Sequence, residues 1–189
     1  MRILILALSM LFTGVPVRAQ LRLSPDFVRL LETSGLDFFQ PLDGRYTSQA
    51  YLKNDLLSAD FIIRSRREKL EIRYNVFPDD PYSDSDDLPH IRAVQMATHL
   101  ASNDDDSIIT ALALEDHDLG EERFNADWGK LFYFRPKSGF SIREHCQMLV
   151  LYKAGRGTVF VFYLFDEAGE ALDRRFFSLA FLPGEGSDE

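Results

Sequence analysis

The chain has 189 residues, of which 46% are hydrophobic and 27% are charged, and its formal net charge is −9. This composition excludes a disordered, collagen-like or multi-spanning membrane protein, since each of those classes needs a very different balance of residues. The negative charge also argues against nucleic acid and anionic membranes as partners, because both attract clustered lysine and arginine.

The first residues have the features of an export signal. Arg2 precedes the apolar run Ile3–Phe12, and the residues up to Ala19 suit signal peptidase. We expect cleavage between Ala19 and Gln20, which divides the chain into a signal peptide (1–19) and a single α+β domain (20–189). The alternative is an uncleaved membrane anchor, but the apolar run is far shorter than the ~20 residues that span a bilayer. The sequence therefore predicts a periplasmic or secreted protein with no membrane anchor after cleavage.

The sequence of the N-terminal half predicts one helix followed by strands. Ser24 and Pro25 begin a short helix, because serine caps helix N-termini and proline suits the first turn. Leu36–Phe39 predicts a strand. Leu70–Phe77 alternates apolar and polar residues, which predicts a strand with one buried and one solvent-facing side. Phe61–Ile63 precedes it as the other half of an antiparallel hairpin.

An acidic loop precedes the middle helix. Residues 78–87 (PDDPYSDSDD) contain five aspartates and two prolines, which favour a loop. Asp86 or Asp87 can cap the helix that follows, Pro89 suits its first turn, and residues 91–101 continue it without a breaking residue.

The C-terminal half contains the longest apolar runs. Residues 108–114 are compatible with a helix or a strand, 116–125 are polar and predicted to be irregular, and 131–134 predict a strand. Residues 148–152 and 158–165 predict a hairpin whose connection contains two glycines suited to positive φ.

The chain closes with a segment whose apolar residues follow helical spacing, namely Leu172, Phe176, Leu179 and Ala180. The run VFVFYLF before it is apolar on both faces, so layers must cover both sides of the sheet. Because helices do not alternate regularly with strands, the fold class is α+β, with a mainly antiparallel sheet and helices covering both faces.

This order of elements resembles the PsbP-like α/β/α sandwich, a fold shared by an extrinsic photosystem II subunit, a small Ran-binding protein and DcrB-type bacterial envelope proteins. The resemblance covers most of residues 36–181 and rests on DFFQPLDGRY, FIIRSRREKLEIRYNVFP, VLYKAGRGTVFVFYLF and LDRRFFSLAF. FNADWG and VFYLFD are also similar to segments of uncharacterised secreted proteins of Bacteroidetes-type bacteria. The resemblance implies a binding or assembly module and carries over no catalytic residue.

The acidic stretches allow a calcium hypothesis. Asp84, Asp86 and Asp87 could gather around Ca²⁺ if their loop folds back on itself, but a solvated acidic loop is the commoner outcome for such a stretch and is favoured here. An EF-hand counted from Asp104 fails, because Ile109 stands where the loop needs glycine. None of the four histidines has a metal-ligand spacing. The sequence therefore predicts no cofactor and no metal site, with the three aspartates as weak candidates.

No nucleophile stands in a recognisable catalytic pattern. Cys146 follows His145, but adjacent side chains on a strand point to opposite faces, and a cysteine before a buried run is typically a small core residue. The sequence therefore favours a binding module over an enzyme. A hydrolase with two carboxylates from distant segments, or a glycan-binding protein, stays open as the alternative.

The best candidate for a ligand site is the segment around the single tryptophan. Asn125 and Asp127 offer hydrogen bonds and Trp128 offers a stacking face, which together are typical of ligand clefts. The alternative is that Asn125 and Asp127 cap a turn while Trp128 fills the core. If the segment binds a ligand, the sequence predicts a protein or glycan partner, and the acidic loop favours a basic one.

Overall fold

The computed structural model describes residues 21–79 and 88–184. Within these ranges it contains, in chain order, α1 (Pro25–Thr33), β1 (Leu36–Phe38), β2 (Thr47–Leu52), β3 (Ala59–Ser65), β4 (Leu70–Pro78), α2 (Pro89–Leu100), β5 (Thr110–Ala113), α3 (Asp116–Leu119), β6 (Trp128–Phe134), β7 (His145–Lys153), β8 (Gly157–Phe165), α4 (Glu170–Arg175) and β9 (Leu179–Phe181).

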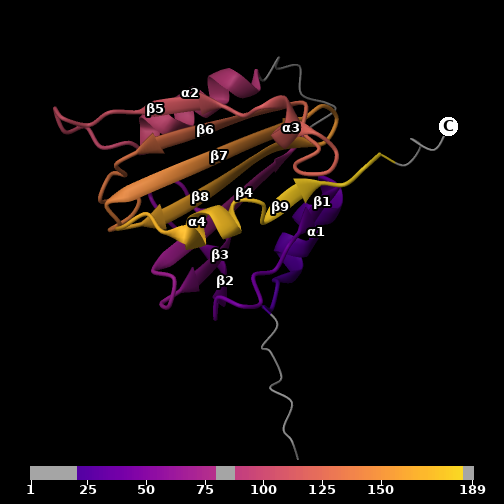
Figure 1. Cartoon of the computed structure of the whole chain (residues 1–189), viewed down its shortest axis with the longest axis horizontal. Coiled ribbons are helices and arrows are strands. Elements are labelled where there is room, and N and C mark those ends of the chain that lie inside the picture. The colour runs from indigo at the N-terminus through magenta and orange to yellow at the C-terminus, as the bar shows by residue number, and fades with distance from the viewer. Residues whose placement is uncertain (1–20, 80–87, 185–189) are drawn as a thin grey trace, which may run out of the picture.

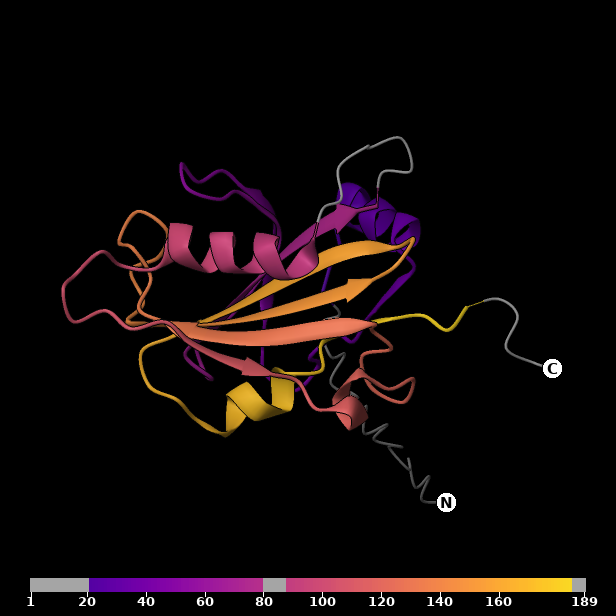
Figure 2. The ribbon, with the colours of Figure 1, turned by 90° about the horizontal axis from the view of Figure 1, so that it is seen from above.

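An antiparallel seven-stranded sheet forms the centre of the fold, with the strand order β2-β3-β4-β8-β7-β6-β5. A two-stranded antiparallel sheet of β1 and β9 lies beside α1 at one end of it (Figure 1). In the turned view, α2 covers one face of the large sheet and α4 lies on the other (Figure 2). The predicted fold class is confirmed: the protein is α+β, with a mainly antiparallel sheet and helices on both faces.

Two apolar clusters hold the layers together, one on each face of the sheet. On the first face, Phe27 of α1 packs with Tyr74, Leu149 and Tyr163. On the second face, small residues of α2 pack against alternate residues of β6, β7 and β8, including Met148. Because β8 contributes to both clusters and all of its residues are buried, the prediction that both faces of this strand are covered is confirmed.

The predicted start of the first helix is confirmed. The Ser24 hydroxyl accepts a hydrogen bond from the Phe27 amide at 3.2 Å, and Pro25 occupies the first turn. The helix ends at Thr33 with Ser34 as its C-cap, and Gly35 follows with a φ of 56° in the left-handed region. Local capping chemistry therefore determines both ends of α1.

The prediction of a solvent-facing side for β4 is wrong. Glu71, Arg73 and Asn75 are buried, because loops cover this side of the strand. The Arg73 guanidinium donates to the Phe140 carbonyl at 2.9 Å and to Glu71 at 2.6 Å, and Asn75 donates to the Ser58 carbonyl at 2.6 Å. The polar alternation in the sequence therefore marks buried polar residues that bond to one another or to neighbouring loops.

The predicted closing helix is also wrong in its extent. The helix α4 ends at Arg175, while Leu179 and Ala180 belong to β9. These residues pair with Phe38 and Asp37 of β1, so a distant segment of the chain supplies the hydrogen bonds that a longer helix would have made internally.

Smaller differences concern the other elements. The sequence did not predict β2, none of whose six residues is buried. The ambiguous stretch 108–114 contains the strand β5, and the polar stretch 116–125 contains the short helix α3. The N-cap of α2 is Leu88, and no side chain caps it.

Some predictions fall outside the residues that the structure describes. The signal peptide with its cleavage site, and Asp84, Asp86 and Asp87, lie in the ranges 1–20 and 80–87. Within 21–79 and 88–184, no helix is long and apolar enough to cross a membrane.

Candidate functional site

Asn125 and Asp127 both bond to neighbouring parts of the chain. The buried Asn125 donates from its side-chain amide to the Phe181 carbonyl at 3.1 Å and accepts from the Lys153 ammonium at 2.9 Å. The exposed Asp127 carboxylate accepts from the Ala154 amide at 2.8 Å. Their polar atoms thus link this turn to β9 and to the β7–β8 connection, and these bonds do not cap the turn's own amides.

The exposure of Trp128 is intermediate between the exposed face that a ligand site needs and the fully buried ring of a core residue. Trp128 is half-buried at the start of β6, opposite Tyr152 of β7, and packs on the edge of the cluster under α2. The two clefts described below are lined by other residues. A ligand site at Asn125, Asp127 and Trp128 stays a prediction.

The described residues contain no group of three or more histidine, cysteine or acidic side chains that could hold a metal ion. Cys146 is buried in the cluster under α2, as predicted for a core residue. Burial raises the pKa of its thiol well above the usual range, although the charge of Arg73 opposes this shift. The thiol is therefore held in its neutral, unreactive form.

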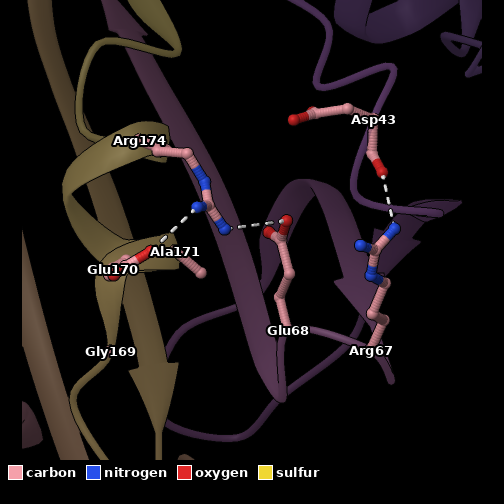
Figure 3. Close-up of a pocket in the computed structure, with 7 residues that line it drawn as sticks. All are labelled: Asp43, Arg67, Glu68, Gly169, Glu170, Ala171 and Arg174. Atoms are coloured by element: carbon pink, nitrogen blue, oxygen red, sulfur yellow. Dashed lines mark hydrogen bonds and ion pairs between the residues drawn. The ribbon is translucent and has the colours of Figure 1, made fainter.

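A cleft of about 540 Å³, lined mainly by charged side chains, lies beside α4 (Figure 3). Its charged lining residues come from the loop before β2, the β3–β4 turn and α4, namely Asp43, Arg67, Glu68, Glu170 and Arg174. Behind them, Glu68 accepts hydrogen bonds from the Tyr46 hydroxyl at 2.6 Å and from the Arg175 guanidinium at 2.7 and 3.1 Å. Arg174 reaches Glu68 at 3.7 Å and Glu170 at 3.4 Å.

Two carboxylates in this cleft lie close enough together to be compared with the carboxylate pair of a hydrolase. Asp43 and Glu68 each place an oxygen 2.7 Å from the same Arg175 nitrogen, so the two oxygens lie within about twice that distance of each other. Pairs of glycosidase carboxyls are about 5–10 Å apart. In such a pair one carboxyl acts as the general acid, so its pKa must be raised enough for it to stay protonated near neutral pH.

Both pKa values shift in the opposite direction. Burial alone would raise the pKa of Glu68, but hydrogen bonds from Arg175 and Tyr46 and the charge of Arg175 lower it below its ordinary value. The pKa of Asp43 is lowered for a similar reason: slight burial is outweighed by its backbone hydrogen bond and by Arg175. The two carboxylates stay ionised and hold Arg175, so neither is suited to act as a general acid.

A second cleft, of about 580 Å³, lies between α4 and the sheet, toward the β5 edge. Thr110, Tyr133 and Gln147 stand opposite one another on β5, β6 and β7. Leu172 and Asp173 of α4 close one side. Burial and the negative charge of Asp173 raise the pKa of Tyr133, which keeps its phenol protonated.

The β5 edge of the sheet is open and apolar. The four residues Thr110–Ala113 are all exposed, and beside them Ile108 is 75% and Leu112 52% exposed. The backbone amide of Leu114 donates a hydrogen bond to the Gly129 carbonyl on β6. In an antiparallel pair, every second residue of a strand forms backbone hydrogen bonds with its neighbour strand, and the residues between point their backbone groups to the other side. The backbone groups of Ala111 and Ala113 therefore point away from β6, toward the free side of the edge.

Sequence reasoning missed the two clefts and the edge. One signal was present for the second cleft: Gln147 is a polar residue inside the otherwise apolar run Cys146–Tyr152. The ionic cluster carried no signal, because Glu68 and Arg175 stand in ordinary charged runs far apart in the chain.

Comparisons with known proteins identify one distant structural likeness. No family model matches the chain, and no curated protein matches it, so the similarity to secreted proteins of Bacteroidetes-type bacteria finds no support. Among solved structures, the chain is similar to cyanobacterial PsbP (CyanoP) from Synechocystis sp. PCC 6803, with 16% sequence identity and a TM-score of 0.41 over 89% of this chain and 95% of that one. A likeness with so low a TM-score carries no argument about this chain.

Proposed function

We propose that this protein is a non-enzymatic binding module of the PsbP-like type, which acts in the periplasm or outside the cell after residues 1–19 are removed. In this proposal, a partner protein adds an extended, basic segment to the free edge of β5. The observation that carries the proposal is the exposure of every residue in this edge strand.

The composition of β5 supports strand addition. Natural sheets protect their edges with charged side chains, proline or bulges, since a bare edge pairs with other chains. The strand β5 has the sequence TALA and carries none of these protecting residues. The opposite edge strand, β2, is more polar, and its Ser48 side chain contacts the Arg22 carbonyl. The β5 edge is thus the better template for a partner strand.

The charges around β5 favour a basic partner. Asp105 and Asp106 precede the strand, Glu115 and Asp116 follow it, and all four are exposed. An extended segment with lysine or arginine at its ends would face opposite charge at both ends of β5. Such complementarity raises the association rate and selects against acidic partners.

A six-residue peptide of alternating lysine and valine provides a direct test. We expect fluorescence anisotropy to show binding that weakens as salt rises, because screening removes the charge attraction. A peptide of the same charge with proline in place of valine cannot add a strand and should bind at least tenfold more weakly. Equal binding of the two peptides would contradict strand addition.

Two substitutions locate the binding site. Ala111→Pro removes a backbone donor on the free side and leaves the ladder to β6 intact, and Leu112→Lys adds a charge to the edge. We expect each to weaken binding of the lysine–valine peptide at least tenfold. The matched control is Tyr51→Lys on β2, where the side chain is 59% exposed. If Tyr51→Lys weakens binding as much as Leu112→Lys, the peptide does not bind at β5.

Export is tested separately. When the full gene is expressed in a secreting bacterial host, we expect the intact mass of the exported protein to correspond to a chain that begins at Gln20. An exported chain that still carries residues 1–19 would contradict this part of the proposal.

The hydrolase alternative has weaker support. Its best carboxylate pair, Asp43 and Glu68, is held ionised by Arg175, as described above. A binding module therefore agrees better with the chemistry of that cleft.

A further inference from the structure

The cleft between α4 and the sheet is lined by a glutamine whose carboxamide has no hydrogen-bond partner among the described residues. Gln147 is only 4% exposed and lines the cleft from β7. Its polar atoms are not among the fully buried side-chain atoms of residues 21–79 and 88–184 that lack a partner, so they are reached from the cleft. A ligand that supplies a donor and an acceptor can therefore bond to them.

Other groups around Gln147 also offer unused hydrogen-bonding capacity. The Tyr133 hydroxyl and the Asp173 carboxylate line the same cleft, and within the described part of the chain neither side chain has a hydrogen-bond partner. Phe165, whose ring stands 5.7 Å from the His145 ring, and Leu172 provide apolar walls. The volume of about 580 Å³ lies within the range of about 300–1,000 Å³ found for small-ligand sites.

The charges of the cleft favour a neutral ligand. The lining residue Arg135 is paired with Asp104 at 3.4 Å. The Asp173 carboxylate opposes an anion. The carboxamide of Gln147 and the hydroxyls of Thr110 and Tyr133 each donate and accept, and His145 adds an imidazole to the lining, so the complementary ligand must also do both.

We propose that this cleft binds a short neutral saccharide that carries acetamido groups. Sugar hydroxyls both donate and accept, and the C–H faces of a sugar ring pack against aromatic and aliphatic walls. An acetamido group can form two hydrogen bonds with the Gln147 carboxamide, one in each direction. This ligand site is separate from the strand addition proposed at β5 and does not depend on it.

A pair of disaccharides tests the proposal. N,N′-diacetylchitobiose carries two acetamido groups, and cellobiose has the same linkage without them. At about 10 mM, which nearly saturates a site with a Kd near 1 mM, we expect diacetylchitobiose to shift the NMR resonances of the Gln147 side-chain amide and its cleft neighbours. Cellobiose should bind at least fivefold more weakly. The absence of shifts with diacetylchitobiose, or equal binding of both sugars, would overturn the proposal.

Substitutions separate binding from folding. Gln147→Leu should weaken diacetylchitobiose binding at least tenfold while the melting temperature stays at or above that of the wild type, because an unpartnered amide is replaced by an apolar group. Tyr133→Phe should also weaken binding. The matched control is Gln95→Leu on the exposed side of α2, which should change neither binding nor folding. Unchanged binding in Gln147→Leu, or a lowered melting temperature, would show that Gln147 is a structural residue and not a ligand-binding one.

Discussion

Replacing Glu68 with glutamine is expected to reduce the free energy of unfolding by about 3 kcal/mol, because it removes one partner of a buried ion pair. The side chains of Glu68 and Arg175 are 7% and 8% exposed, and the two groups share a two-point hydrogen-bonded contact. Without the Glu68 charge, the Arg175 guanidinium keeps only Asp43 as an ionic partner among the described residues. Urea denaturation at neutral pH measures the loss.

The same cluster predicts how stability depends on pH. The pKa of Glu68 in the folded protein lies below its ordinary value of 4.5, and that of Asp43 below 3.8. A carboxyl with a lowered folded pKa stabilises the protein fully above its ordinary pKa, and this contribution is lost as the pH falls through the folded value. The stability difference between wild type and Glu68→Gln should therefore be constant from pH 7 to about pH 5 and shrink below pH 4.

Glu170→Gln is the matched control. Glu170 also pairs with Arg174 in the same cleft, but its side chain is 93% exposed. Exposed pairs contribute about 0–1 kcal/mol, so this variant should unfold almost like the wild type at every pH. Equal losses in the two variants, or a difference for Glu68→Gln that does not change between pH 7 and pH 3, would contradict the role of the buried pair.

Gly157→Ala is expected to destabilise the protein by at least about 3 kcal/mol, through backbone strain and a collision that cannot relax. Gly157 has a φ of 119° and begins β8, where it pairs with Pro78 of β4 and Lys153 of β7. A Cβ at this position would meet the Phe77 carbonyl oxygen and the backbone of Asp79. These are main-chain atoms of a neighbouring central strand, so the collision is relieved only by moving the strand.

Alanine substitutions at two other glycines distinguish the contribution of backbone strain from that of the Cβ collision. At Gly155, φ is 70° and a Cβ would meet nothing within 4 Å, so Gly155→Ala should cost only the left-handed strain of about 1–2 kcal/mol. At Gly169 the φ is not positive and the space is open, so Gly169→Ala should be nearly neutral. Thermal unfolding of the three variants should follow this order. A Gly157→Ala variant no less stable than Gly155→Ala would show that strand contact is unimportant there.

Local patterns predicted much of the sheet and the first helix correctly. The hairpin of β7 and β8 was predicted from two apolar runs and the glycines between them, because its contacts lie close in the chain. Ser24 and Pro25 likewise predicted the start of α1, because capping involves only neighbouring residues.

Elements that depend on distant partners were missed. The helical spacing of apolar residues in Leu172–Ala180 predicted one helix, but pairing with β1 makes Leu179–Phe181 a strand. Glu71 and Arg73 were predicted to face solvent, and the distant loop that carries Phe140 buries them. Neither outcome follows from periodicity, which describes one segment at a time.

The sequence by itself determined the fold class, the mainly antiparallel sheet and the need to cover both of its faces, because apolar periodicity and turn residues act over a few neighbouring positions. Only the tertiary structure decided where functional groups meet. It placed Tyr133 opposite Gln147 beneath α4, joined Glu68 to Arg175 across the fold, and left β5 at an open edge. Each of these arrangements depends on strand order and on contacts between distant segments, and no local pattern in the chain encodes them.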